Sequence, residues 1–202
     1  MEKIILDKPI NLDEVLEFAK VKHAGQKRDN GDDYIVHPIR VAKIVDYYKG
    51  QYSKNREVLL AASLLHDTLE DTYTSFLELR DHFGIEVASL VEELTNASYS
   101  SKIIGKGLYL AEKMQMMTNY ALIIKLADRL DNVRDLEFTS KDKKQRIISD
   151  TQFILNYLPE HRELTGSQTK LCAEIKKAID KQNTNLSEKK PNKNGEGETN
   201  DL

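Results

Sequence analysis

The sequence predicts an all-α protein, and three observations support this. Apolar residues recur at intervals of three and four along most of the chain, as they do on one face of a helix. No segment shows the alternation of apolar and polar residues that is typical of strands, and no internal repeat is evident. Residues that favour helix starts, namely Asn11, Pro38 and Ser75, precede or open several of the apolar patterns.

The N-terminal half is expected to form five helices. The segment GQKRDNGDDY (25–34) is rich in Gly, Asn and Asp and predicts a loop between the first two. Pro38 suits the first turn of the second helix, and Glu78 stands in capping-box spacing from Ser75. The other four helices are expected at 12–24, 56–70, about 75–83 with its end at Gly84, and 85–95.

The C-terminal half is expected to begin with a flexible loop. Residues 97–108 contain two glycines and three serines, which interrupt the helical pattern. Further helices are expected at about 109–118, 119–136, 142–158 (ended by Pro159) and 167–181. From Gln182 onward the chain has almost nothing to bury, so we expect one domain over 1–181 and a disordered tail over 182–202.

The composition favours a soluble protein without a nucleic-acid or membrane partner. The chain has 202 residues, of which 40% are hydrophobic and 31% charged, and its formal charge is −3. No basic stripe interleaved with aromatic residues is present, and no apolar run approaches the ~18–20 residues that span a bilayer. The N-terminus carries acids where a signal peptide needs an apolar core. We expect a cytoplasmic protein whose single cysteine, Cys172, is reduced and partly buried.

The stretch SLLHDTLEDT (63–72) carries four ionisable side chains that continue an apolar stripe. These are His66, Asp67, Glu70 and Asp71, and no lysine or arginine lies near them in the sequence. Three clustered carboxylates without cations repel one another, and burial adds to the cost. A bound divalent cation removes this cost. A salt-bridged surface helix is the ordinary alternative, but the absence of local cations favours a metal.

Two further segments contain candidate metal ligands. His37 stands just before Pro38 at a loop-to-helix junction, and Asp128 lies inside the apolar run ALIIKLADRLDN. The alternatives are a packed or capping role for His37 and a buried pair of Asp128 with Lys125 or Arg129. With the His-Asp pair, these residues make a mixed nitrogen and oxygen donor set, which suits Mn²⁺, Fe²⁺ or Zn²⁺ better than Ca²⁺.

The ordered set HAGQKRDNGDDYIVHP, LLHDTLEDT, FG and IKLADRLDNVRDL resembles the HD-domain hydrolases of the RelA/SpoT alarmone family. The resemblance covers roughly residues 12–157. It implies a helical bundle and an enzyme that removes pyrophosphate from the 3′ position of a small nucleotide, (p)ppGpp, by Mn²⁺-assisted hydrolysis, leaving GDP or GTP. Another divalent transition metal would suit the same ligands.

The resemblance also implies roles for individual residues. It implies metal ligation by His37, His66, Asp67 and Asp128, and water activation by Glu70 and Asp71, without saying which of the two is the base. Arg28 matches an arginine near the guanine base and phosphates, although it could be a solvated loop residue. Asn132 matches an asparagine near the nucleotide, or serves as a packing amide. Tyr34 either lines the pocket or packs in the core.

The chain also departs from the family pattern. Asp29-Asn30-Gly31 stands where Lys-Ser-Gly is usual, Asp33 replaces a proline, and Asp131 and Asp135 replace the commoner His and Thr. These changes leave the metal set intact but leave open whether the nucleotide is a guanosine alarmone, (p)ppApp or a deoxynucleotide. A nucleotide sensor without turnover is a further alternative. No segment of the size of the family's synthetase domain follows residue 181, so we expect a small stand-alone hydrolase.

Overall fold

The computed structural model describes residues 9–96 and 103–188, and within them the prediction of an all-α protein is confirmed. Apart from one isolated antiparallel bridge between Lys27 and Asp33, the regular structure described is helical. The elements are α1 (Leu12–Lys22), α2 (Val36–Tyr48), the 3₁₀ turn η1 (Gly50–Tyr52), α3 (Arg56–Leu65), α4 (Thr68–Asp71), α5 (Phe76–Phe83), α6 (Ile85–Leu94), α8 (Lys106–Met116), α9 (Asn119–Arg134), α10 (Lys141–His161) and α11 (Gly166–Glu188).

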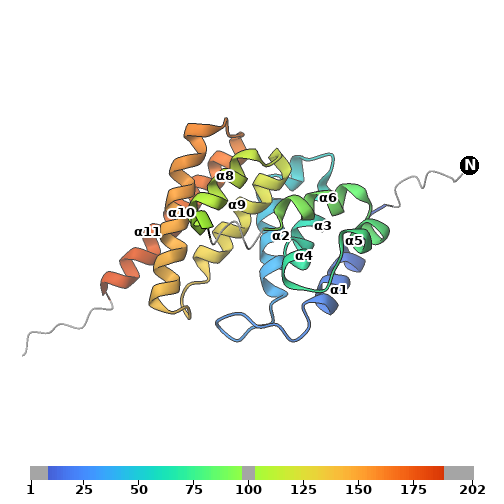
Figure 1. Cartoon of the computed structure of the whole chain (residues 1–202), viewed down its shortest axis with the longest axis horizontal. Coiled ribbons are helices and arrows are strands. Elements are labelled where there is room, and N and C mark those ends of the chain that lie inside the picture. The colour runs from blue at the N-terminus through green and yellow to red at the C-terminus, as the bar shows by residue number, and fades with distance from the viewer. Residues whose placement is uncertain (1–8, 97–102, 189–202) are drawn as a thin grey trace, which may run out of the picture.

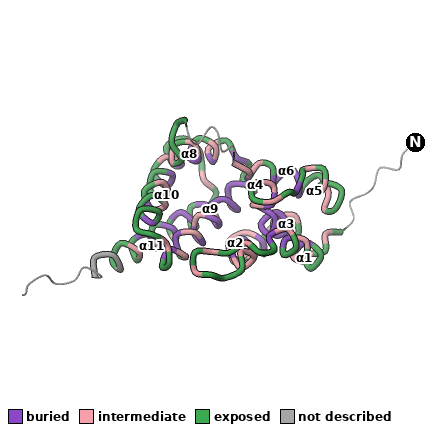
Figure 2. The backbone as a smooth tube through the Cα atoms, turned by 60° about the horizontal axis from the view of Figure 1, so that its bottom comes forward, coloured by how far each residue is buried: buried purple, intermediate pink, exposed green. Residues whose placement is uncertain are grey.

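Helix α9 lies at the centre of the molecule. Helices α1 to α6 lie on one side of it and helices α8, α10 and α11 on the other (Figure 1). It contacts α11 and α10 as well as α2, α3 and α6, and its backbone is coloured as buried over most of its length (Figure 2). Each large apolar side chain that it buries contributes about 1.5–3 kcal/mol. Side chains on α9 are therefore held in a fixed frame between the two groups of helices.

Several helix boundaries follow from local signals, as predicted. Asn11 caps α1, because its side chain accepts a hydrogen bond from the backbone N–H of Asp13 at 3.0 Å. Ser75 caps α5 through the N–H of Glu78 at 3.1 Å. Gly84 ends α5 at φ +88°, in the region that favours glycine. These caps set the directions of the first helix and of the helix that follows the His-Asp motif.

The single helix expected at 56–70 is wrong, because the chain breaks at His66 and Asp67. Helix α3 ends at Leu65 and α4 begins at Thr68. The Thr68 hydroxyl donates to the Leu65 carbonyl at 2.7 Å, and Nδ1 of His66 donates to the carbonyl of Ser63 at 2.9 Å. Side chains thus use carbonyl groups at the end of α3, and the two metal-ligand candidates lie in the turn between the helices.

The loop expected at 97–108 is wrong at its C-terminal end. Residues 97–102 lie outside the described part of the chain, but α8 already begins at Lys106, three residues before the predicted start. Gly105, with φ +87°, allows the sharp entry into this helix. Leu110, Ala111 and Met114 then bury one face of α8, and this packing outweighs the poor helix propensity of Gly107 in its first turn.

Two C-terminal boundaries also differ from the prediction. Pro159 lies inside α10, which ends shortly afterwards at His161. Proline removes its own helical hydrogen bond and crowds the carbonyl four residues before it, which fits a helix end just beyond Pro159 rather than at it. Helix α11 continues past the predicted boundary at 181, and Gln182 donates from Nε2 to the Val133 carbonyl at 3.0 Å. The rest of the predicted tail, from residue 189, lies outside the described residues.

Two further expectations concern Cys172 and membrane helices. Cys172 is a free, buried thiol, and burial raises its pKa to about 11. Among the residues that the structure describes, none of the helices combines the length and apolar character needed to cross a bilayer.

Candidate metal centre and adjoining pocket

His66 presents an unpaired nitrogen to the interior of the protein. Its side chain is buried, and Nδ1 uses its hydrogen for the Ser63 carbonyl. Nε2 is buried without a hydrogen-bond partner and lies 3.0 Å from Oδ2 of Asp67. A buried polar atom of this kind normally has a partner. The lone pair of Nε2 is therefore suited to a metal ion.

His37 lies in the first turn of α2 and faces the same point. Its Nε2 is 3.4 Å from Oδ1 of Asp128 and 3.7 Å from Oδ2 of Asp67. Its Nδ1 lies 2.6 Å from Oδ2 of Asp131. Burial lowers the pKa of His37, but the hydrogen bonds with Asp128 and Asp131 outweigh burial and raise the pKa to about 9. The surrounding carboxylates thus favour a positive charge here, and a metal cation supplies one equally well.

Asp128 divides its two oxygens between two environments. Oδ2 lies 3.3 Å from the amino group of Lys125 and 3.7 Å from the guanidinium of Arg129. Oδ1 faces His37 and accepts a hydrogen bond from the side-chain amide of Asn132. Burial raises the pKa of Asp128, but Lys125 and Arg129 outweigh burial and hold the pKa well below its usual range. The structural pairing considered above accounts for one oxygen, and the other remains directed at the histidines.

The four predicted ligands converge, three of them more tightly than the fourth. His37, His66 and Asp128 are buried and each offers a donor atom within 4.8 Å of the others. Asp67 adds an oxygen within 3.0–3.7 Å of the two histidines. Two nitrogen and two oxygen donors, with an unpartnered buried nitrogen among them, fit a divalent transition metal.

Tyr34 connects this cluster to Asp71. Its hydroxyl donates to Oδ2 of Asp67 at 2.5 Å and lies 3.4 Å from Oδ2 of Asp71. Burial, together with the charge of Asp67, raises the pKa of Tyr34 well above its usual value, so the hydroxyl keeps its proton. Tyr34 is thus a donor that orients Asp67, in addition to lining the pocket described below.

Glu70 and Asp71 lie on α4 with exposed side chains. Oε2 of Glu70 accepts hydrogen bonds from the backbone N–H of Asn96 at 3.0 Å and from its side-chain amide at 2.9 Å. Burial of part of Asp71, and repulsion by Asp67 and Glu70, raise the pKa of Asp71. The turn at 66–67 separates Glu70 and Asp71 from α3, so they do not continue the apolar stripe of that helix as the sequence predicted.

A group of cations surrounds the Asp128 side of the cluster. Lys125 is buried, and Nε of Arg129 is buried without a hydrogen-bond partner. Burial and then repulsion by Arg129 lower the pKa of Lys106. Burial and then repulsion by Lys125 lower the pKa of Lys113 to about 8. Positive charge is therefore crowded beside the metal-ligand candidates, and a bound anion would relieve this repulsion.

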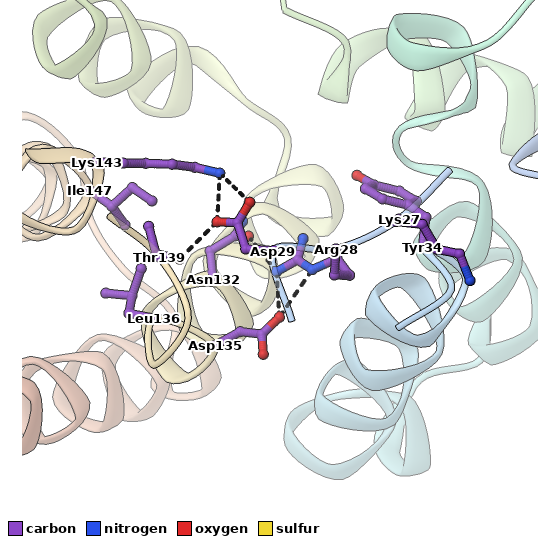
Figure 3. A pocket seen from close by; sticks show the side chains of 10 residues that line it. All are labelled: Lys27, Arg28, Asp29, Tyr34, Asn132, Asp135, Leu136, Thr139, Lys143 and Ile147. Atoms are coloured by element: carbon purple, nitrogen blue, oxygen red, sulfur yellow. Dashed lines mark hydrogen bonds and ion pairs between the residues drawn. The ribbon is translucent and has the colours of Figure 1, made fainter. Parts of the chain in front are cut away.

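The three substrate-binding candidates line one pocket of about 150 Å³. The pocket lies between the 25–34 loop, the end of α9 and the start of α10 (Figure 3). Nη2 of Arg28 donates to Oδ2 of Asp135 at 2.9 Å and to Oδ1 of Asn132 at 3.3 Å. Asn132 in turn donates to Asp128. Asn132 thus links the pocket to the metal-ligand candidates. The lining residues are Lys27, Arg28, Asp29, Tyr34, Asn132, Asp135, Leu136, Thr139, Lys143 and Ile147.

Asp29 is held by α10 rather than free at the pocket entrance. Its carboxylate accepts hydrogen bonds from Lys143 at 2.7 and 2.9 Å and from Thr139 at 2.8 Å (Figure 3). These contacts lower the pKa of Asp29, the bond from Lys143 most of all. Sequence reasoning missed this pair, because Asp29 and Lys143 are 114 positions apart and nothing local to either residue indicates the other.

The sequence also did not reveal the partners of His37 and Arg28. Asp131 and Asp135 share Arg40, and each also contacts one of the residues singled out above. The sequence did contain an indication, because Asp131 and Asp135 follow Asp128 by about one and two helical turns. This spacing places all three acids on the same side of the helix. The sequence identified them only as departures from a family pattern.

Comparison with known proteins supports the resemblance. A family model described as the HD domain matches residues 15–163. The human guanosine-3′,5′-bis(diphosphate) 3′-pyrophosphohydrolase MESH1 is 42% identical over 125 residues, which cover 61% of this chain and 68% of the human protein. A protein of the same enzymatic name from Aquifex aeolicus is 37% identical over 166 residues. These cover 76% of this chain but only 22% of the Aquifex protein, so the chain spans about a fifth of that relative.

A solved structure matches over most of the chain as well. It belongs to a metazoan orthologue of SpoT, described as hydrolysing ppGpp and acting in starvation responses, with a TM-score of 0.71 and 27% identity. The match covers 84% of this chain and 94% of that one. The family match, the human relative and the helical architecture agree with one another. The chain therefore belongs to the HD-domain family and is related to its ppGpp 3′-pyrophosphohydrolases.

Proposed function

We propose that this protein is a metal-dependent hydrolase that removes the 3′-pyrophosphate of guanosine alarmones, converting (p)ppGpp to GDP or GTP and pyrophosphate. The observation that carries the proposal is the convergence of His37, His66 and Asp128 beside a pocket and a group of cations. The named activity of the human relative, of which this chain covers 68%, supplies the substrate class. Residues 1–181, together with the observed continuation of α11, would form the catalytic domain.

His37, His66, Asp67 and Asp128 are the proposed ligands of a divalent metal, and we propose Mn²⁺. The mixed nitrogen and oxygen donors suit Mn²⁺, Fe²⁺ or Zn²⁺, so the choice of Mn²⁺ rests on the family resemblance. Such a metal supplies Lewis acidity toward a phosphoryl oxygen and toward water.

Side chains of this protein are suited to transfer the proton, orient the water and bind the phosphates. Asp71, whose pKa is raised, is suited to take a proton on a carboxylate oxygen and return it to the leaving group. Glu70, fixed by Asn96, is suited to orient the attacking water. Arg129, with its unpartnered Nε, and Lys106 are suited to bind phosphate oxygens.

Product analysis of the purified protein tests the proposal. With Mn²⁺ present, ppGpp should give GDP and pyrophosphate in equal amounts, and the (p)ppApp and deoxynucleotide reactions should be slower. If the protein cleaves another nucleotide but no nucleotide with a 3′-pyrophosphate, the hydrolase activity is supported and the assignment of an alarmone substrate is wrong. Binding of ppGpp without any product would instead make the protein a nucleotide sensor.

Arg28→Ala should raise KM for ppGpp by about 10- to 100-fold with a much smaller change in kcat. Charge-assisted hydrogen bonds to a phosphate are worth about 1.5–3 kcal/mol, and Arg28 is half-buried in the pocket wall. Steady-state rates of pyrophosphate release across a salt series measure this, because salt screens the attraction. Arg80→Ala is the control, since Arg80 pairs on the surface with its neighbour Asp81. An unchanged KM would show that Arg28 does not contribute to nucleotide binding and is a solvated loop residue.

Asp29→Asn should lower KM for ppGpp by about two- to fivefold, since exposed ion pairs are worth up to about 1 kcal/mol. The substitution releases Lys143, which lines the pocket and now faces Asp29. Lysine at this position would be a poorer test, because it would stand against Lys143. Asp32→Asn is the matched control, because it makes the same charge change on the same loop without a pocket lysine as partner. Equal KM values for the two variants would contradict a specific role for the Asp29–Lys143 pair.

A further inference from the structure

Asp131 is a buried carboxylate next to the metal-ligand candidates that the proposed reaction does not use. It lies on α9 with 2% of its surface exposed. Its Oδ2 accepts from Nδ1 of His37 at 2.6 Å, and its Oδ1 accepts from Nε of Arg40 at 2.7 Å. A buried carboxylate needs such partners. The choice of partners is informative, because one of them is a proposed metal ligand.

We propose that Asp131 is a positioning residue of the metal centre, holding His37 so that its Nε2 lone pair is directed at the metal. The inference rests on the proposed metal centre but not on the identity of the nucleotide. An imidazole that donates from Nδ1 offers its lone pair at Nε2, so the acceptor at Nδ1 selects the ligating nitrogen. In His37 that nitrogen is the one that faces Asp67 and Asp128.

The two histidines of the centre are oriented in the same way by different acceptors. His66 donates from Nδ1 to the backbone carbonyl of Ser63 at 2.9 Å, whereas His37 uses the Asp131 carboxylate at 2.6 Å. Both arrangements leave Nε2 facing Oδ2 of Asp67, and the ring centroids are 5.2 Å apart. A carboxylate acceptor also makes the imidazole a more basic ligand than a carbonyl does. Asp131 should therefore strengthen metal binding as well as orient His37.

Arg40 keeps Asp131 in place. It bridges both oxygens of Asp131, from Nε at 2.7 Å and from Nη2 at 3.0 Å, and its Nη2 also donates to Asp135 at 2.9 Å. His37 and Arg40 both lie on α2, so the two side chains that hydrogen-bond to Asp131 are carried by the same helix. Asp135 in turn binds Arg28 of the pocket. The ordinary alternative is that Asp131 serves only as the ionic partner of Arg40.

Asp131→Asn distinguishes a role in positioning His37 from a role as the ionic partner of Arg40. The amide has nearly the same shape, but one of its two positions becomes an NH₂ group facing a donor, either His37 or Arg40. Either orientation removes the negative charge that makes His37 a more basic ligand, and an NH₂ group that faces His37 also makes the imidazole lose the bond or present the wrong nitrogen. We expect the Kd for Mn²⁺, measured by electron paramagnetic resonance titration of the full chain without nucleotide, to rise about 10- to 100-fold. The absorption spectrum of the Co²⁺-loaded variant should also shift. A Kd equal to that of the unmodified protein overturns the proposal.

Asp135→Asn is the matched control. It removes the other carboxylate partner of Arg40, at the C-cap of the same helix, and no hydrogen bond joins Asp135 to His37. Its Mn²⁺ affinity should equal that of the unmodified protein. If both variants lose affinity to the same extent, anchoring of Arg40 explains the effect and the proposal is wrong. Circular dichroism and melting of the metal-free proteins show whether each variant is folded.

A measurement on the unmodified protein does not depend on the folding of any variant. Nitrogen-15 NMR of the Zn²⁺-loaded protein should show His37 coordinated through Nε2, with a proton retained on Nδ1. Coordination through Nδ1 would overturn the proposal. These tests also separate the inference from the proposed function. If Asp131→Asn lowers metal affinity but ppGpp is not hydrolysed by the unmodified protein, the substrate assignment fails and the role of Asp131 stands.

Discussion

Replacing His66 by alanine is expected to abolish stoichiometric metal binding and, with it, hydrolysis of ppGpp. His66 contributes a buried nitrogen, Nε2, that has no hydrogen-bond partner. Loss of a direct ligand should cost more affinity than the about 10- to 100-fold that loss of a supporting hydrogen bond costs. Asp128→Asn should act in the same direction, because it removes the charge that faces His37 while keeping the shape. Metal content by atomic emission, followed by turnover at saturating Mn²⁺, measures both effects.

The control for these variants is His161→Ala. His161 lies on the surface, where it stacks on Tyr157 and donates from Nδ1 to the carbonyl of that residue. It should retain full metal content and turnover. Asp128→Asn also weakens a buried ion pair with Lys125, so its melting temperature without metal must be measured alongside. Full metal content in either His66→Ala or Asp128→Asn would exclude the proposed ligand set.

The convergence of the metal-ligand candidates could be predicted, because each stands in a distinctive local setting. His37 precedes a proline that opens a helix, and Asp128 interrupts the apolar face of α9. A carboxylate in such a position needs a partner, so the sequence itself indicates a site. The contact of α2, α3 and α9 then brings these settings together. Packing of these helices against α9 thus brings together candidate ligands that lie far apart in the sequence.

The break between α3 and α4 could not be predicted from periodicity. The apolar stripe continues through Leu65 to Leu69, and the interruption comes from side-chain hydrogen bonds made by His66 and Thr68. Serine and threonine make such bonds in helices as well as at their ends, so their presence alone does not decide the outcome. The consequence for function is large, since the turn directs His66 inward while α4 carries Glu70 outward.

Charge near the pocket was the other feature that the sequence could not settle. Asp29 stands where lysine is usual in the family pattern, and the structure pairs its negative charge with Lys143. Arg28 is likewise paired, with Asp135. Each of these two pocket cations therefore comes with a carboxylate that a nucleotide must displace. Lys106, near the metal-ligand candidates, is instead crowded by the positive charge of Arg129. This difference favours the metal side of the site for phosphate and the pocket for the rest of the nucleotide.

Glu70→Gln should separate chemistry from metal binding. The amide oxygen can still accept a hydrogen bond from the Asn96 backbone, so the fold and the metal content should be unchanged. The amide keeps the shape of Glu70 but loses the negative charge that holds the attacking water, so kcat should fall. A fall as large as the about 10²- to 10⁴-fold of a lost acid-base role would make Glu70 rather than Asp71 the proton carrier. Single-turnover hydrolysis of ppGpp at saturating Mn²⁺ measures the effect. Glu57→Gln, an exposed carboxylate on α3, is the control.

Comparison of Glu70→Gln with Asp71→Asn then assigns the two roles. Asp71 has the raised pKa and lies near Asp67 and Tyr34, so it is the better candidate to carry the proton. Its substitution should flatten the pH dependence of kcat, whereas Glu70→Gln should lower kcat equally at every pH. If the two profiles are exchanged, Glu70 is the base and Asp71 orients the water. An unchanged kcat in both variants would leave the metal centre in place but remove both residues from the reaction, because neither would then act on the water or the leaving group.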